Sequence, residues 1–456
     1  MTSLARDVTD STPRVCIIGA GSSGITAAKA LHERGIPFTC FEASDEVGGN
    51  WLFGNSNGMS SAYRNLFINS SRRRMSFSDF PLPDSLPDYA HHSDIADYFR
   101  EYVEHFGFRH RIMFRTSVER AELTPEDHWR ITLSNGDVQE FDALLVANGH
   151  HWDPRWPEPP FPGSERFTGL QLHSHHYVDP TIFEDKSVVV LGMGNSAMDI
   201  AVESSYVARR TYLAHRRGAW IVPKYLFGRP IDELFFQNRY LSRIPLGPRR
   251  RLAHWMIRII VGSPERYGLK QPDHRLGEAH PTVSSRVLDR LAHGMIIAKP
   301  NIAELGERSV RFEDGSEVDA DVVVYCTGYK ITFPFFDEDF LSAPDNDIQP
   351  FFRVFHPEVP NLAFIGLVQP TSAIMPIAEA QARWVGDWLL GRYELPATEA
   401  MRRDVERFAE AMASRYVASK RHTIQIDFDD YLVDLAKEAR AGARRASRSA
   451  STSAPA

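Results

Sequence analysis

The chain has 456 residues, too many for one compact core, so we expect a multidomain globular protein. Hydrophobic residues make up 43% and charged residues 24%, proportions that exclude disorder for most of the chain. The net charge of -7 comes from basic and acidic residues spread along the sequence, and this spread does not indicate a nucleic-acid partner.

The cysteine positions and the hydropathy of the chain indicate the cellular compartment of the protein. Cys16, Cys40 and Cys326 lie in apolar runs and form no CxxC pair, which indicates buried thiols and argues against a redox disulfide. The first residues lack the apolar stretch of a signal peptide, and no window reaches the roughly 18 uninterrupted apolar residues of a membrane span. We predict a cytoplasmic protein without a transmembrane span.

Residues 14–42 predict a strand, a glycine turn, a helix and a second strand that ends at Glu42. In such a unit the glycines allow a tight turn and a close backbone approach to a pyrophosphate, which sits on the helix N-terminus. A carboxylate at the end of the second strand can accept hydrogen bonds from ribose hydroxyls. We therefore predict an adenosine dinucleotide site formed by Gly19, Ala20, Gly21, Ser22, Ser23, Gly24 and Glu42.

A second copy of this unit begins at Ser187, with Ala197 in place of the third glycine, a change that the fingerprint tolerates. The residue that stands as far from Gly192 as Glu42 stands from Gly19 is His215, and Arg216 and Arg217 follow it. Arginines bind a ribose 2′-phosphate, whereas a carboxylate repels it. The first site is therefore predicted to exclude a 2′-phosphate and the second to accept one; the alternative is that the two arginines form a solvated turn.

Two further apolar strands, which end near Gly149 and Gly328, bracket the second unit. We predict an α/β fold with two Rossmann-like dinucleotide-binding domains, the second inserted into the first. The expected boundaries are 1–160 and 319–440 for the first domain, 161–318 for the inserted domain with a helical insertion, and 441–456 for a disordered tail of low complexity.

Residues 167–177 read FTGLQLHSHHY and resemble the fingerprint FxGxxxHxxx, followed by Tyr or Phe, of the class B flavin-containing monooxygenases. Baeyer-Villiger monooxygenases carry Trp at the last position, so Tyr177 favours the branch that oxidises heteroatoms. The chain lacks the hydrophobic C-terminal anchor typical of vertebrate members, so we expect a soluble member of the family. Other matches cover nearly the whole chain, at 46–51, 67–70, 78–81, 192–203, 216–220, 363–384 and 421–425.

The resemblance implies FAD in the first fold and NADPH in the second. It adds the FAD-contacting residues Gly49, Asn50 and Trp51, and it places Asn69 and Ser70 beside the flavin ring and the nicotinamide. Asn69 is the residue that we expect to be catalytic, by orienting the oxygenated flavin and the retained NADP; its alternative role is that of a turn or capping asparagine. The NADP-binding residues implied are Gly192, Gly194, Asn195, Ser196, Ala197, Met198 and Asp199, with Arg216 and Arg217.

The resemblance also implies the reaction, in which NADPH reduces the flavin, dioxygen adds to form a C4a-hydroperoxyflavin, and one oxygen atom enters an amine nitrogen or a sulfide sulfur. Baeyer-Villiger oxidation of ketones by the same intermediate is the alternative. A flavin disulfide reductase would need a CxxC pair, and a dinucleotide sensor would bind both cofactors without substrate-stimulated NADPH consumption. The expected partners are dioxygen and a small amine, sulfide or ketone, and a homodimer is left open.

Two other patterns have competing interpretations. His173, His175 and His176 stand close together, but the further ligands and the spacing of a zinc site are not evident, so we predict no metal site. The stretch 246–262 mixes arginines and large apolar residues at helical spacing. It is interpreted either as an interfacial helix or, preferably, as a helix that packs on its own domain with a basic outer face.

Overall fold

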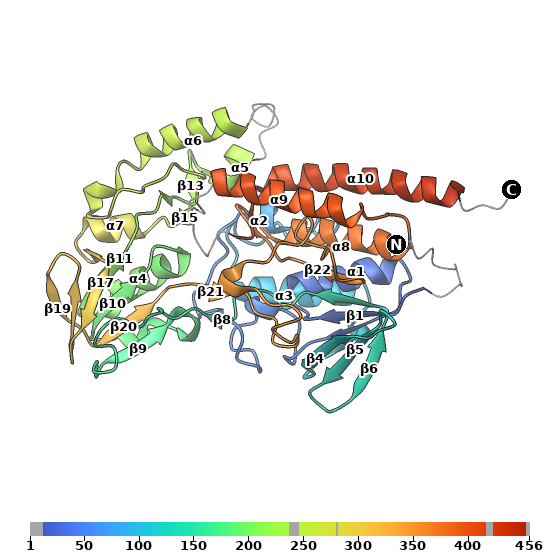
Figure 1. Ribbon diagram of the computed structural model, residues 1–456. Coiled ribbons are helices and arrows are strands. Elements are labelled where there is room, and N and C mark those ends of the chain that lie inside the picture. Colours follow the sequence, from blue (N-terminus) through green and yellow to red (C-terminus); the bar gives the residue numbers. More distant parts are fainter. Residues whose placement is uncertain (1–11, 237–245, 280, 416–422, 453–456) are drawn as a thin grey trace.

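The computed structural model describes residues 12–236, 246–279, 281–415 and 423–452. Its two central sheets are both parallel and both have five strands. Each central strand is a continuous apolar run, as expected for strands that are covered on both faces. Figure 1 shows the two sheets side by side, with α9 and α10 running above the first.

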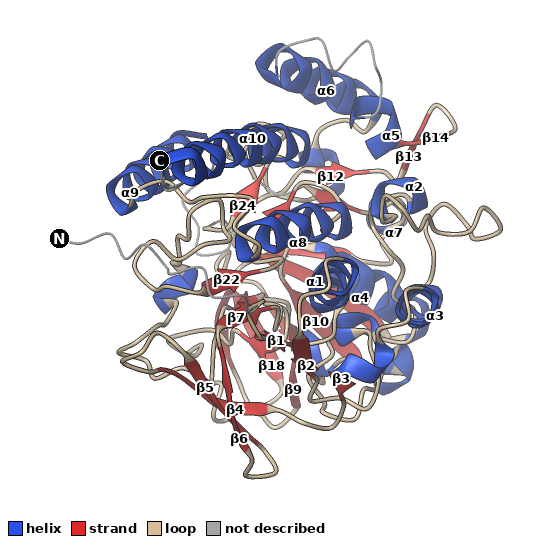
Figure 2. Cartoon of the chain, turned by 90° about the vertical axis from the view of Figure 1, so that its right-hand side faces the viewer, coloured by secondary structure: helices blue, strands red, loops and turns tan. Residues whose placement is uncertain are grey.

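The first sheet has the strand order β22-β7-β1-β2-β3. Because side chains alternate along a strand, Val15 and Ile17 of β1 face one core, while Cys16 and Ile18 face another. The first core lies between the parallel sheet and the helices α1 and α8, and the second lies between the parallel sheet and an antiparallel sheet of β4, β5 and β6 (Figure 2). The elements are β1 (Val15–Ile18), α1 (Ser22–Glu33), β2 (Phe38–Phe41), α2 (Arg72–Met75), α3 (His92–His105), β3 (Ile112–Met113), β4 (Val118–Leu123), β5 (Trp129–Leu133), β6 (Val138–Phe141), β7 (Ala143–Val146), β22 (Leu362–Phe364) and α8 (Met375–Leu389).

The second sheet has the strand order β16-β11-β10-β20-β9, and it is covered by α4 on one face and by the β17-β18-β19 sheet on the other. Short strands and helices between β11 and β16 extend this domain toward the first. The elements are β9 (Leu170–His173), β10 (Ser187–Leu191), α4 (Asn195–Val207), β11 (Arg210–His215), β12 (Ile221–Val222), β13 (Tyr225–Leu226), β14 (Arg229–Pro230), α5 (Ile231–Phe236), α6 (Leu246–Ile260), β15 (Thr282–Val283), α7 (Val287–Ala292), β16 (Ile297–Pro300), β17 (Ile302–Leu305), β18 (Ser309–Phe312), β19 (Glu317–Asp319) and β20 (Val322–Tyr325).

The fold is the predicted pair of Rossmann-like units, but the chain returns to the first domain later than expected. β20 pairs with β10 and β9 and therefore belongs to the second sheet. The outgoing strand β8 (Asp153–Pro154) pairs with the returning strand β21 (Tyr329–Lys330), and this pair links the domains. The predicted boundary at 319 was early because β7 and β20 share one pattern, an acidic residue followed by an apolar run, and that pattern does not say which sheet a strand joins.

The tail predicted to be disordered from Ala441 is instead helical as far as Thr452, as the end of α10 (Phe428–Thr452). Gly442 packs against the ring of Tyr393, and Arg445 donates to the carbonyl of Glu394 at 3.0 Å. These contacts anchor a segment whose composition alone resembles a linker. Residues 453–456 lie outside the described residues. The remaining elements of this region are β23 (Gln369–Pro370), α9 (Thr398–Arg415) and β24 (Gln425–Ile426). Among the described helices, none has the length and apolar character needed to cross a lipid bilayer.

Candidate active site

The two parallel sheets present their carboxyl ends to one pocket, with a volume of about 1980 Å³. Ligands of open α/β sheets bind at this end of the strands. The first sheet contributes the residues after β1, β2 and β7, and the second contributes those after β10 and β20. The predicted site residues that line the pocket are Gly19, Gly21, Ser22, Ser23, Glu42, Gly49, Asn50, Trp51, Asn69, Ser70, Gly192, Gly194, Asn195, Ser196, Ala197, Arg216 and Arg217.

The glycine turn after β1 is shaped to receive a pyrophosphate. A Cβ on Gly24 would lie 1.7 Å from the carbonyl oxygen of Gly19, so only glycine lets α1 pack this closely on the turn. Gly21, the N-cap residue just before α1, has no side chain to cap the helix, which leaves the N–H groups of the first turn available to an anion. A second turn closes over the first, because the position of a Cβ on Gly49 is 2.9 Å from Cα of Gly21.

Glu42 is a rigid part of the pocket wall. Its side chain is buried, and its two oxygens accept hydrogen bonds from the N–H groups of Ala20 and Ser44 at 2.6 and 2.7 Å. Burial raises the pKa of Glu42, and these backbone N–H groups oppose that rise. Each carboxylate oxygen keeps a lone pair for a ribose hydroxyl. This environment fits the adenosine half of FAD and repels a 2′-phosphate.

The second nucleotide fold is built differently at the equivalent position. His215 is buried, its Nε2 accepts the N–H of Lys270 at 2.9 Å, and burial lowers its pKa, so the imidazole is neutral and structural. Arg216 and Arg217 are exposed and line the pocket, and Nε of Arg217 lies 3.9 Å from a carboxylate oxygen of Asp273. Two guanidinium groups near the carboxyl end of β11 fit a ribose 2′-phosphate.

Four predicted contact residues do not line the pocket. Ala20 and Gly24 act within the first turn, through the backbone bond to Glu42 and the close approach described above. Met198 packs in the core of the second domain, and Asp199 accepts a hydrogen bond from the hydroxyl of Tyr63 at 2.6 Å. The Met198 side chain therefore lies in the core and the Asp199 side chain lies against Tyr63, a residue that itself lines the pocket. The contact of these two residues with NADP stays a prediction.

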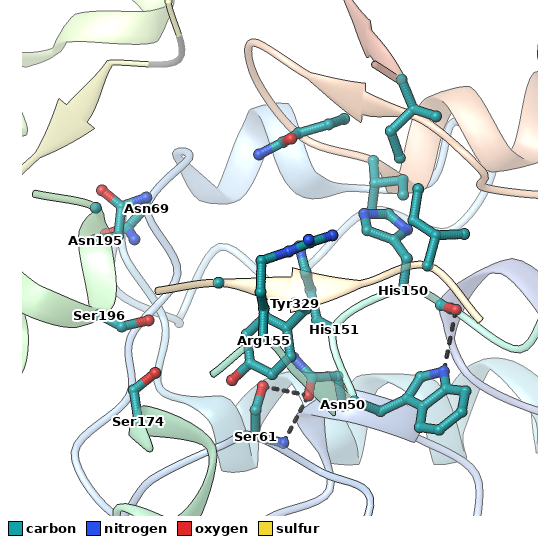
Figure 3. Close-up of a pocket in the computed structure, with 18 of the residues that line it drawn as sticks. Asn50, Ser61, Asn69, His150, His151, Arg155, Ser174, Asn195, Ser196 and Tyr329 are labelled. Carbon is teal, nitrogen blue, oxygen red and sulfur yellow. Dashed lines mark hydrogen bonds between the residues drawn. The ribbon is translucent and has the colours of Figure 1, made fainter. Parts of the chain in front are cut away.

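Asn69 and Ser70 lie on the segment between η1 (Gly49–Trp51) and α2, and both line the pocket. The side-chain amide of Asn69 forms no hydrogen bond within the part of the chain that the structure describes. Figure 3 shows Asn69 and Asn195 entering the same side of the pocket from the two domains. Asn195 is held in place, since its Oδ1 accepts the N–H of Val283 at 2.9 Å. A free amide at the meeting point of the domains fits a role toward a bound ligand.

Several pocket residues escaped the sequence analysis. Arg155 and Tyr329 come from the β8-β21 link, and Ser61 donates to Asn50 Oδ1 at 2.8 Å through both its N–H and its hydroxyl (Figure 3). His150 and His151 also line the pocket. Burial lowers the pKa of His150 well below its usual range, so His150 is neutral there.

The fingerprint residues His173 and Tyr177 are buried outside the pocket. His173 Nδ1 accepts the N–H of His175 at 3.1 Å, and burial together with the neighbouring His175 and His176 lowers the pKa of His173 to about 4. The hydroxyl of Tyr177 donates to Glu203 of α4. These residues join β9 to α4 and to the interdomain link. No group of three His, Cys, Asp or Glu side chains suited to a metal ion occurs among the described residues.

Two dinucleotide folds that face one pocket define a flavin- and nicotinamide-dependent oxidoreductase. The profile of the flavin-binding monooxygenase-like family matches residues 12–445, and the chain belongs to this family. The chain is 39% identical over 439 residues to flavin-containing monooxygenase 5 of Rattus norvegicus, and the alignment covers 93% of this chain and 82% of the relative. It is 35% identical over 441 residues to dimethylaniline monooxygenase (N-oxide-forming) 2 of Mus musculus, with the same two coverages.

A solved structure similar to this chain is that of S-allyl-L-cysteine S-oxygenase from Allium sativum, with a TM-score of 0.70 and 26% identity over 97% of this chain and 94% of the other. The open crystal structure of cyclohexanone monooxygenase has a TM-score of 0.72 at 18% identity, covering 95% and 98%, and shows the shared fold alone. The predicted family and fold are confirmed. The chain is a flavin-dependent monooxygenase that uses FAD and NADPH.

Proposed function

We propose that this enzyme inserts one oxygen atom from dioxygen into the nitrogen of an amine or the sulfur of a sulfide. The observation that carries the proposal is one pocket shared by two unequal dinucleotide sites, with the side-chain amide of Asn69, which has no hydrogen-bond partner among the described residues, at their junction. Two similar proteins, an N-oxide-forming monooxygenase and an S-oxygenase, support soft nucleophiles as the substrate class. No strong general acid is needed for attack by such a lone pair.

Each domain would bind one of the two cofactors. The turn at 19–24, Glu42 and the turn at 49–51 would hold FAD, and the turn at 192–197 with Arg216 and Arg217 would hold NADPH. When bound, the two groups supply the hydride and the site at which dioxygen is activated. The protein supplies binding, orientation and a dry surface.

Exclusion of water comes from apolar side chains that share the pocket with Asn69. Leu66 lies on the first domain, while Val222, Ile231 and Ile257 come from the segment between β11 and β16. Water in such a site would divert activated oxygen to hydrogen peroxide. Asn69 can donate a hydrogen bond through its amide without offering a proton, so it would orient the reacting groups rather than act as an acid.

A substrate panel tests the reaction class. A thioether and a tertiary amine should give a sulfoxide and an N-oxide, with NADPH consumed in proportion to product. A cyclic ketone measured under the same conditions should give less lactone. If lactone exceeds both other products at equal substrate concentration, the Baeyer-Villiger alternative replaces this proposal.

Replacing Asn69 tests its role. We expect Asn69→Ala to leave anaerobic flavin reduction by NADPH near the wild-type rate and to shift oxygen use toward hydrogen peroxide. Asn69→Asp keeps the size but removes the N–H donors, so it should uncouple as well. Peroxide per NADPH that stays at the wild-type level in both variants would show that Asn69 has another role.

We also propose that the enzyme works in the cytoplasm. The support is chemical, since Cys16, Cys40 and Cys326 are buried thiols that form no disulfide, as suits a reducing compartment. Fractionation of the native host with an antibody would test the location. The homodimer stays a prediction, which light scattering of the purified holoenzyme can check.

A further inference from the structure

The backbone on either side of Asn69 and Ser70 is held by two charged side chains that come from the second domain. Lys224, between β12 and β13, donates from Nζ to the carbonyl of Ile68 at 3.0 Å. Asp232, in α5, accepts the N–H of Ser71 through Oδ2 at 2.6 Å. The two residues between these bonds are those that line the pocket.

The first domain holds the same stretch at its two ends, and the carbonyl of Ser71 accepts the N–H groups of Arg74 and Met75 at 2.9 and 3.0 Å. The N–H of Ile68 donates to the carbonyl of Ala90 at 3.0 Å, and the N–H of Arg72 donates to the carbonyl of Asp88 at 2.7 Å. The inner backbone groups, the carbonyl of Ile68 and the N–H of Ser71, are therefore the ones that the second domain holds. Bonds with a charged partner are stronger than neutral ones, which makes these two suited to fix a short loop.

Lys224 and Asp232 have different surroundings. The ammonium of Lys224 lies 4.7 Å from the ring centre of Tyr89, whose hydroxyl donates to the Lys224 carbonyl at 2.6 Å. Asp232 is buried, and its Oδ1 has no hydrogen-bond partner within the described residues. Oδ2 accepts the N–H of Ser71, while Asp232 also lines the pocket beside Asn69 and Ser70.

We propose that Lys224 and Asp232 are positioning residues that hold residues 68–71, here named the Asn69 loop, in the geometry needed for coupled oxygen transfer. The inference rests on the proposed role of Asn69. Under this proposal, the position of the Asn69 loop in the first domain depends on contacts from the second domain. The loop is correctly placed only while the segment from Lys224 to α5 packs against it. A displaced loop would leave hydride transfer intact and release oxygen as peroxide.

Paired variants separate this role from simple stabilisation. Lys224→Met and Asp232→Leu remove the two bonds, whereas Lys224→Arg and Asp232→Asn keep a donor and an acceptor. The matched controls are Arg229→Met, at an exposed position in β14, and Asp289→Asn, at an exposed position in α7. Each purified holoenzyme is compared for amide hydrogen exchange in the peptide covering 68–71, for peroxide released per NADPH, and for the rate of anaerobic flavin reduction.

We expect faster exchange in the Asn69 loop and severalfold more peroxide in Lys224→Met and Asp232→Leu, with the rate of flavin reduction unchanged. The conservative variants and both controls should behave like the wild type. In an Asn69→Ala background, Lys224→Met should add no further peroxide, because residues that act through one group are not additive.

Wild-type exchange and coupling in Lys224→Met and Asp232→Leu would overturn the inference, and so would equal peroxide release from the controls. The failure of the proposed function is distinguishable from this. If Asn69→Ala itself stays coupled, the role of Asn69 is wrong, while the exchange of the 68–71 peptide still decides whether the two charged residues hold the loop.

Discussion

The two nucleotide folds share a strand, a glycine turn and a helix, yet they differ at the end of the following strand. In the first fold, Glu42 is buried and bonded to the backbone of the glycine turn. In the second fold, His215 takes the buried place and Arg216 and Arg217 extend into the pocket. We propose that the glycine turn holds a pyrophosphate in both folds and that the residues at the end of the following strand decide which dinucleotide each fold accepts.

The third position of the turn offers a second contrast. Gly24 leaves no room for a Cβ, while the second fold places Ala197 at the same point, fully buried in its core. The first turn is thus the tighter of the two. Three experiments test these features, starting with the largest expected effect.

Gly24→Ala should abolish flavin retention. The added Cβ would lie 1.7 Å from the carbonyl oxygen of Gly19, so the turn or α1 must move, at a cost of about 1–3 kcal/mol or more. The matched variant Ala197→Gly opens space in the other fold and should cost about 1 kcal/mol of stability without loss of flavin. The measurement is the flavin content of each purified protein; a yellow Gly24→Ala protein with full FAD would contradict the packing argument.

Neutralising the arginine pair tests the second site. Arg216→Gln combined with Arg217→Gln should raise KM for NADPH by roughly ten- to a hundredfold, because a hydrogen bond to a charged group contributes about 1.5–3 kcal/mol. KM for NADH should change little. Arg210→Gln, at the exposed start of β11, is the control. An equal rise in KM for NADPH and NADH would show that the two arginines do not bind the 2′-phosphate.

Protonation of the buried fingerprint histidine should produce a smaller effect. Burial holds the pKa of His173 at about 4, whereas an unfolded histidine has a pKa of about 6.5. Between these pH values the unfolded chain binds a proton that the folded chain does not, so stability falls as the pH is lowered from 6.5 toward 4, by at most about 1.4 kcal/mol per pH unit.

The variant His173→Asn keeps an acceptor for the N–H of His175 and should flatten this pH dependence of the free energy of unfolding. Replacing the exposed His110 with Asn should leave it unchanged. Denaturant unfolding at several pH values measures the slopes. Parallel curves for wild type and His173→Asn would mean that other buried groups, such as His150, cause the acid sensitivity.

Much of the fold could be predicted from the sequence, because an apolar strand, a glycine turn and a helix are recognisable in both units. The sheet to which β20 belongs could not be predicted, since β7 has the same local pattern of an acidic residue followed by an apolar run. Glu42 and the arginine pair followed from spacing. Asn69 came only from the family resemblance, because a lone asparagine in a loop has no local signature.

Other parts of the site depend on long-range contacts that no local pattern encodes. Arg155 and Tyr329 reach the pocket through the pairing of β8 with β21, and Lys224 and Asp232 meet the Asn69 loop across the domain boundary. The end of α10 was predicted incorrectly for a similar reason. Its low-complexity composition suggested disorder, while packing on Tyr393 keeps it helical.

The most direct test of the account is oxygen transfer from isotopically labelled dioxygen to a thioether by the holoenzyme with NADPH. Two unequal dinucleotide sites that serve one pocket should place one labelled oxygen atom in the sulfoxide for each NADPH oxidised, with little peroxide. Sulfoxide that carries oxygen from water, or NADPH oxidation that yields only peroxide with every amine and sulfide tried, would contradict it.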